Sequence, residues 1–310
     1  MTDHSLSRRQ LCAALAALPL AGATGLSAAA RAGTNVPDDS FGWDDGGMVA
    51  VSGGRLNWRR IGRGSGMPVV LLHKLGGWIA DWRHIAPLLA AERPLIAIDL
   101  PGHGDSAMYG PPPYIQTVPE SAAMIASALQ QLGVDRYGLL GNSLGGVIAI
   151  AMAAYWPGTV HELSLVSVSL ASGIGRAELA EKERVRDPAV WTEDWRPLPR
   201  TGAATAMFGT IDPAIADEQN RSRAKADRWV RPSERGAAVL DIAGHLARTQ
   251  CPVQVMIPHG GSYARFADVP QAARPDAELV RIADAGSFMH QEAPDVVAAE
   301  LLRFWRSIGN

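Results

Sequence analysis

The segment GNSLG at residues 141–145 places a serine between two glycines, where two elements of different kind should meet. The preceding residues YGLL are typical of a buried strand, and the apolar run after Gly145 predicts a helix ended by Pro157. Glycines allow the tight, strained turn that lifts a serine hydroxyl above a sheet, and the helix N-terminus supplies free backbone N–H groups. The pattern predicts Ser143 as a nucleophile; the alternative is a tight turn with an idle serine.

Strands and helices alternate on both sides of this segment. The expected elements, after a hairpin at 48–62, are strands at 68–73, 94–100, 137–142, 161–170, 252–258 and 277–283, and helices at 81–92, 118–133, 144–156 and 295–308. Repeated strand–helix units predict an α/β fold with a mostly parallel sheet and helices on both faces.

Residues 171–235 interrupt the alternation. They are polar, lack a strong strand and predict a helical cap over one end of the sheet, between core segments 33–170 and 236–310. Five large apolar side chains in this region could line an apolar substrate pocket or simply pack the cap on the core: Trp191, Trp195, Met207, Phe208 and Trp229.

The first 32 residues have the features of a targeting segment. Paired Arg8-Arg9 precede an apolar run at 11–26, and Ala30-Arg31-Ala32 fits a cleavage site. The adjacent arginines are similar to a twin-arginine signal, which predicts a periplasmic or secreted protein. A membrane anchor is the alternative, but the run is short and rich in alanine and glycine.

The composition bounds the partners. The chain has 310 residues, a net charge of −2 and 19% charged residues, so no basic face for nucleic acid is expected. The histidines are scattered without metal-ligand spacing, and no phosphate-binding or dinucleotide motif occurs, so no metal or other cofactor is expected. We expect a small-molecule substrate; the oligomeric state is left open.

From about residue 46 to the end, the chain resembles the α/β-hydrolase superfamily. The stretch LLHKLGGWIADW at 71–82 resembles its oxyanion loop, IDLPGHGDS at 98–106 resembles its turn after the fourth strand, and GNSLGG is its nucleophile elbow. The resemblance implies the fold predicted above, with residues 171–235 as the cap that covers the pocket.

The resemblance also implies roles. Ser143 would be the nucleophile, and the backbone N–H groups of Leu144 and Leu75 would form the oxyanion hole that stabilises charge in acyl transfer. His73 would shape the loop, and Trp78 is the aromatic side chain expected nearest the substrate. A serine at the elbow disfavours dehalogenase or epoxide hydrolase chemistry, which uses a carboxylate nucleophile.

Three departures from the family pattern concern one pocket. Lys74 replaces the glycine that usually follows the oxyanion-loop histidine. The loop at 258–266, where the triad acid usually lies, has no carboxylate before Asp268. In ADAGSFMHQEAP, at 283–294, Ser287 occupies the position of the usual catalytic histidine, and His290 matches a second, usually structural one.

A serine needs a base, and several remain open. His290 could act if its loop is remodelled, or be a buried structural residue. Lys74 could be the base of a Ser–Lys pair if burial suppresses its charge, or simply bind an anion. His259 could contact His290 or the ligand, and Asp268 or Asp284 could be the acid.

We expect an exported serine hydrolase of an ester-like bond in a small apolar substrate. The rival hypothesis is a site without triad hydrolysis: a ligand-binding protein, or a lyase or isomerase that uses the oxyanion loop and Lys74 to stabilise an anion. An amide or C–C bond hydrolase is not separated from an esterase by these motifs.

Overall fold

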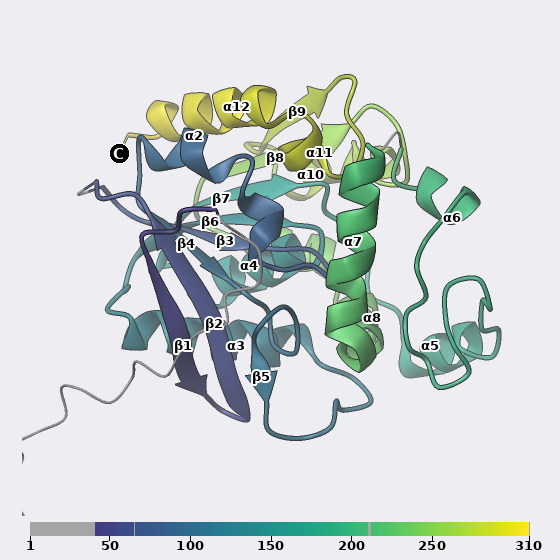
Figure 1. Ribbon diagram of the computed structural model, residues 1–310. Coiled ribbons are helices and arrows are strands. Elements are labelled where there is room, and N and C mark those ends of the chain that lie inside the picture. Colours follow the sequence, from purple (N-terminus) through teal and green to yellow (C-terminus); the bar gives the residue numbers. More distant parts are fainter. Residues whose placement is uncertain (1–40, 65, 210–211, 310) are drawn as a thin grey trace, which may run out of the picture. The chain divides into compact units, whose positions relative to one another are not determined.

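A central sheet organises the computed structural model, which describes residues 41–64, 66–209 and 212–309 (Figure 1). In those residues eight strands follow the order β1-β2-β4-β3-β6-β7-β8-β9, and β5 pairs with β2. The strands are β1 (Asp45–Val51), β2 (Gly54–Ile61), β3 (Val69–Leu72), β4 (Leu95–Ile98), β5 (Ala107–Met108), β6 (Tyr137–Asn142), β7 (Val160–Val166), β8 (Val253–Pro258) and β9 (Glu278–Ile282).

The strand directions confirm the predicted α/β architecture. The hairpin β1–β2 is antiparallel and joins β4 antiparallel, whereas every pairing from β4 to β9 is parallel. The central strands β3, β4 and β6 are buried along their whole length, as expected of a parallel sheet covered on both faces. The two-residue strand β5 was not predicted, since so short a pairing leaves no periodic pattern.

Alternate side chains of the strands pack against two separate helical layers. Val69 and Leu71 of β3 share one apolar cluster with α2 (Ala86–Ala90), the 3-10 turn η1 (Ile79–Trp82) and α12 (Pro294–Ser307). Val70 and Leu72 face the other cluster, which contains residues of α3 (Val118–Gln131), α4 (Leu144–Tyr155) and α9 (Ile242–Ala247). The period of two in the strands therefore builds both layers.

The helix predicted at 81–92 is instead two short pieces, η1 and α2. Pro87 stands within the first two positions of α2. Proline lacks an N–H and its ring clashes with the preceding turn, so it is tolerated at a helix start but not inside one. The helix predicted at 118–133 is confirmed as α3, with a capping box between Thr117 and Glu120 at its start.

The segment between β7 and β8 contains the helices that stand at one end of the sheet, on the right in Figure 1. These are α5 (Arg176–Lys182), α6 (Ala203–Ala206), α7 (Pro213–Ala226), η2 (Asp227–Trp229) and α8 (Val230–Val239). The cap predicted at 171–235 lies in this same segment of the chain, and α8 ends four residues after the predicted end of the cap.

Helix α7 is tied to the core by polar side chains. The Gln219 amide donates to Gln291 Oε1 at 2.7 Å, and Gln291 in turn donates to the backbone carbonyl of Asp81 at 3.0 Å. Glu218, which is 3% exposed, forms a two-pronged ion pair with Arg83 and accepts from Trp78 Nε1 at 3.3 Å. Opening this half-buried ion pair is costly, because Glu218 would be left buried without its opposite charge.

The predicted signal segment, residues 1–32, lies outside the described residues. Within the part that the structure describes, no helix combines the length and apolar character needed to cross a bilayer. Helix α10 (Val269–Ala273) follows β8, and α11 (Met289–Glu292) precedes α12.

Candidate active site

Ser143 lies at a sharp turn between β6 and α4. Its backbone has φ 49° and ψ −114°, a conformation that costs energy for a residue with a side chain. A Cβ atom at Gly145 would lie 2.0 Å from the Leu72 carbonyl oxygen, so the start of α4 approaches the end of β3 at a distance only glycine allows. The strand–turn–helix geometry predicted from GNSLG is therefore present.

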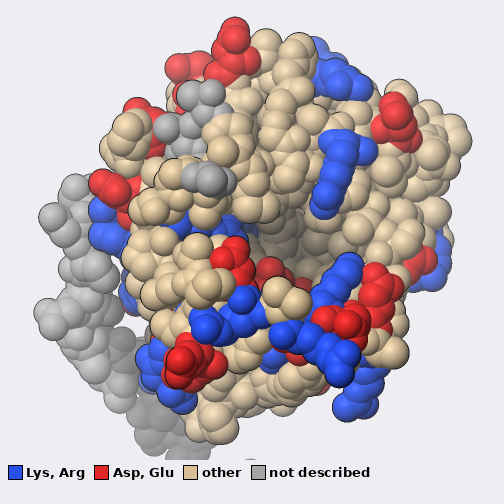
Figure 2. All heavy atoms as spheres, turned by 90° about the vertical axis from the view of Figure 1, so that its right-hand side faces the viewer, with Lys and Arg blue, Asp and Glu red and all other residues tan. Residues whose placement is uncertain are grey.

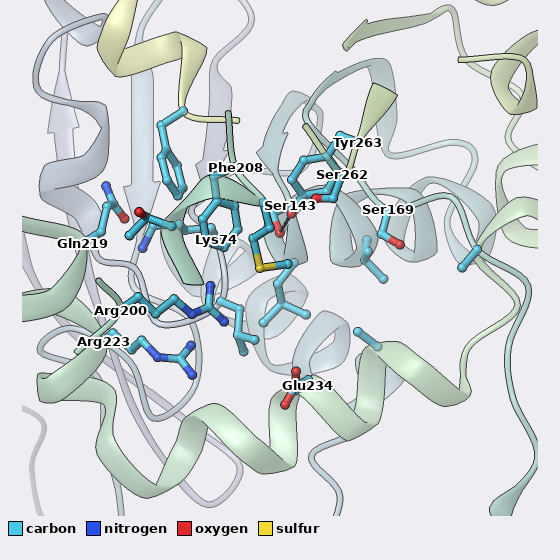
Figure 3. Close-up of a pocket in the computed structure, with 18 of the residues that line it drawn as sticks. Lys74, Ser143, Ser169, Arg200, Phe208, Gln219, Arg223, Glu234, Ser262 and Tyr263 are labelled. Carbon is cyan, nitrogen blue, oxygen red and sulfur yellow. Dashed lines mark hydrogen bonds between the residues drawn. The ribbon is translucent and has the colours of Figure 1, made fainter. Parts of the chain in front are cut away.

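The serine opens into a pocket of about 400 Å³ between the core and the cap (Figure 3). Figure 2 shows the face that carries the cap, which is hollowed near its centre. Polar and charged side chains from three parts of the chain line this pocket: Lys74, Ser143, Ser169, Arg200, Thr205, Gln219, Asn220, Arg223, Glu234, Ser262, Tyr263 and Arg265. Apolar residues, including Val147, Met207, Phe208, Ile242 and Phe288, form the rest of the wall.

Leu144 and Leu75 line the pocket together with Ser143. Leu144 is the first residue of α4, where a backbone N–H has no partner within the helix. Leu75 follows β3 in the adjoining loop. The two amides thus come from the start of α4 and from the loop after β3, the two segments that could form an oxyanion hole beside Ser143. Their role as that hole stays a prediction.

Tyr263 is the hydrogen-bond partner of Ser143, and sequence reasoning missed it. The two hydroxyl oxygens are 2.8 Å apart. Burial raises the pKa of the Tyr263 phenol above its usual value, although the bond to Ser143 and nearby arginines oppose this. The phenol is therefore protonated at neutral pH and is a poor base. The sequence did contain a signal, because Tyr263 lies in the loop after β8, where the triad acid was expected and no carboxylate was found.

The structure does not bring His290 to Ser143. Its ring packs 4.7 Å from the Trp82 ring, it is 1% exposed, and neither ring nitrogen has a hydrogen-bond partner among the described residues. Burial, and after it the charges of Lys74 and His84, lower the pKa of His290 to about 3. In this arrangement His290 has the surroundings of a core residue, which is the alternative that the sequence left open. The Ser287 hydroxyl is also buried and has no hydrogen-bond partner among the described residues.

Lys74 lines the pocket with its amine largely withdrawn from solvent. Lys74 Nζ lies 3.4 Å from the Gly76 carbonyl, 3.5 Å from Ser222 Oγ and 3.7 Å from Asp81 Oδ2. Burial lowers the pKa of Lys74 and raises that of Asp81 to about 6, while their mutual attraction opposes both shifts. No direct hydrogen bond joins Lys74 to Ser143, so proton transfer between them would need a bridging water or substrate atom.

His73 fixes the loop that carries Lys74 and Leu75. Its Nε2 accepts from the Leu100 backbone N–H at 3.0 Å, so its Nδ1 carries the proton and donates to the Lys74 carbonyl at 2.8 Å. Burial holds the pKa of His73 well below its usual value, so the ring is neutral. This geometry is what the loop-shaping role implied for His73 requires.

The other expected site residues lie outside the pocket lining. Trp78 donates to Glu218 and contacts the Lys225 ammonium at 5.7 Å. His259 is exposed, and its backbone N–H bonds to Ile282. Asp268 precedes α10 and Asp284 occupies a turn with φ 55°. In the described part of the chain no His, Cys, Asp and Glu cluster is placed to hold a metal ion.

Comparisons with known proteins agree with this geometry. Residues 69–300 match the model of the Alpha/beta hydrolase family. Over 251 residues the chain is 30% identical to 2-succinyl-6-hydroxy-2,4-cyclohexadiene-1-carboxylate synthase of Serratia proteamaculans, covering 76% of this chain and 92% of that protein. It is 29% identical over 268 residues to the dihydrolipoyllysine-residue acetyltransferase component of the acetoin cleaving system of Pseudomonas putida, covering 83% and 68%.

Among solved structures, the enol-lactonase of Burkholderia xenovorans LB400 superposes with a TM-score of 0.66. The match covers 84% of this chain and all of that one at 19% identity, which supports the fold. The family match, the elbow and the sheet order lead to one assignment: this chain belongs to the alpha/beta hydrolase family.

Proposed function

We propose that this protein is an exported hydrolase that cleaves an ester or lactone bond of a small substrate through Ser143. One observation carries the proposal: Ser143 is held in a strained turn at the wall of a pocket that Leu144 and Leu75 also line. Family membership supports an enzyme of the hydrolase class. Export rests on the sequence of residues 1–32 alone.

In the proposed reaction Ser143 Oγ attacks the substrate carbonyl carbon, and the carbonyl oxygen becomes an oxyanion that accepts from the two amides. The serine proton passes through a bridging water to Lys74, whose pKa burial lowers, and from there to the departing oxygen. Water then attacks the acyl-enzyme in the same way and releases the acid. Tyr263 keeps the Ser143 hydroxyl oriented between these steps.

A fluorophosphonate probe tests the nucleophile. We expect covalent labelling of the wild type at Ser143, seen by mass spectrometry, and none of Ser143→Ala. Hydrolysis of p-nitrophenyl acetate should follow the same pattern. Wild-type protein that is folded, unlabelled and inactive toward esters and lactones would contradict the proposal.

The base is assigned with a pair of variants in the same assay. If Lys74 accepts the proton, Lys74→Met should slow labelling by about a hundredfold or more, whereas His290→Gln should leave it near the wild-type rate. The opposite result would return the role to His290 and imply that its loop moves when substrate binds.

A second candidate is a lyase or isomerase that stabilises an enolate in the same oxyanion hole. It is favoured by the hydrogen bond between Ser143 and Tyr263, because the serine of a triad hydrolase bonds to a histidine instead. A relative named as a synthase aligns over 92% of its own length. Turnover in H₂¹⁸O separates the two: hydrolysis places one ¹⁸O in the acid product, and a lyase or isomerase places none.

A further inference from the structure

Arg223 is a buried cation that forms no ion pair with the described residues. It is 5% exposed, it projects from α7 and it lines the pocket. Its Nε and Nη2 atoms have no hydrogen-bond partner among the described residues, and the contact of its guanidinium is the Trp191 ring at 4.8 Å. A buried charge normally has an opposite charge or several hydrogen bonds beside it, because removing the charge from water is energetically costly.

A second guanidinium lies next to it. Arg200, from the loop before α6, runs into the pocket beside Arg223 (Figure 3). Its guanidinium packs 4.8 Å from the Phe208 ring centre, and its side chain forms no ion pair with the described residues. Burial, and then the charge of Arg200, lower the pKa of Arg223 to about 9, so the Arg223 guanidinium remains charged at neutral pH.

The one carboxylate of the lining does not neutralise this pair. Glu234 faces the pocket from α8, but its Oε2 accepts from Arg231 Nη1 at 2.6 Å, and no hydrogen bond joins it to Arg200 or Arg223. The lining otherwise carries Lys74 and Arg265, so basic groups outnumber acidic ones. Among the described lining residues Glu234 is the one anion on the cap side; its charge favours the charged form of both arginines, but neither arginine forms an ion pair with it.

We propose that Arg200 and Arg223 bind the carboxylate of the ligand that occupies this pocket. Two guanidiniums offer planar, paired N–H donors that match a carboxylate, and aromatic rings behind them hold both in place. A doubly charged phosphate is disfavoured by Glu234. The apolar wall around Val147 and Ile242 fits a short hydrocarbon chain.

This inference deepens the proposed function. If Ser143 is the nucleophile, the substrate is a monoester of a short dicarboxylic acid, or a lactone that carries a separate free carboxylate. The apolar substrate expected from the sequence is thereby revised to an apolar chain with a charged end.

Calorimetric titration tests the site without relying on turnover. The probes are glutarate, adipate and phenylacetate, with dimethyl glutarate as the neutral control and inorganic phosphate as the competing anion. We expect saturable binding of at least one of the three carboxylates, and weaker binding of dimethyl glutarate and of phosphate. Arg223→Gln and Arg200→Gln should each raise that Kd by about ten- to a hundredfold, the value of a charge-assisted pair.

The matched control is Arg221→Gln, because Arg221 is exposed on the same helix and should leave the Kd unchanged. Ser143→Ala should also bind the carboxylate, which separates this site from the chemistry: failure of labelling at Ser143 would overturn the hydrolase proposal alone. Since Arg223→Gln could impair folding, circular dichroism is recorded, and Arg200→Gln, at a half-buried position, supplies the second variant. Absence of binding to the wild type, equal Kd values in folded variants, or tighter binding of phosphate would overturn the carboxylate site.

Discussion

At the scale of single residues, Ser143 is strained by its backbone and held by a phenol. The strained turn exposes its hydroxyl to the pocket, while the 2.8 Å bond to Tyr263 fixes the direction of that hydroxyl. Because burial raises the pKa of Tyr263, the phenol orients the serine without removing its proton. In the proposed mechanism, orientation and activation, which one histidine provides in a triad, are divided between Tyr263 and Lys74.

Tyr263→Phe should lower kcat by about tenfold while KM changes little, because the lost hydrogen bond is made to a reacting atom rather than to the substrate. Steady-state kinetics on an ester substrate measures both constants. Tyr155→Phe is the control, since Tyr155 bonds to His245 and does not line the pocket. A Tyr263→Phe enzyme with wild-type kcat would show that the contact has no part in the reaction.

At the scale of elements, the close approach of α4 to β3 holds the elbow against the oxyanion loop. A Cβ at Gly145 would meet the backbone of Leu72 and His73 at 2.0–2.6 Å, and backbone atoms cannot move aside as a side chain tip can.

Gly145→Ala should therefore lower the free energy of unfolding by about 3 kcal/mol or more, the upper range for forcing an extra methyl into a packed site. Urea unfolding measures the change. Gly158→Ala is the matched control, because its Cβ would meet nothing within 4 Å. Equal midpoints for the two variants would mean that α4 shifts at little cost.

The spacing of apolar residues made most elements predictable, because buried strands and amphipathic helices place these residues in regular patterns. The sheet, the elbow at Ser143 and the helix α3 followed from such patterns. The break before Pro87 could have been predicted from the proline itself, whereas the two-residue β5 could not, since tertiary contacts decide it. Tyr263 and Arg223 reach Ser143 and the pocket through loops and a cap whose paths have no sequence period.

At the scale of the whole molecule, His290 links the site region to stability against acid. The unfolded chain binds a proton on this histidine below pH about 6.5, whereas the folded protein, with a pKa of about 3, does not. The unfolded state therefore gains protons first, and the folded state loses stability as pH falls from about 6.5 towards 3.

From pH 7 to pH 5, the wild type should lose roughly 2 kcal/mol more stability than His290→Leu does, since the variant lacks this titration. Urea unfolding at both pH values measures the difference, in which the shared titrations of Asp81 and Asp99 cancel. Parallel losses in wild type and His290→Leu would mean that His290 takes up its proton as readily in the folded state.

Helix α7 supplies Arg223 and Gln219 to the pocket and is also anchored to the core through Glu218, Gln219 and Gln291. Swinging this helix outward would separate the half-buried Arg83–Glu218 ion pair and the hydrogen bonds Trp78–Glu218 and Gln219–Gln291 at once, which is costly. We therefore expect this wall to stay in place during turnover. Ligand exchange would then depend on the width of the pocket entrance, and product release would have no hinge step to wait for.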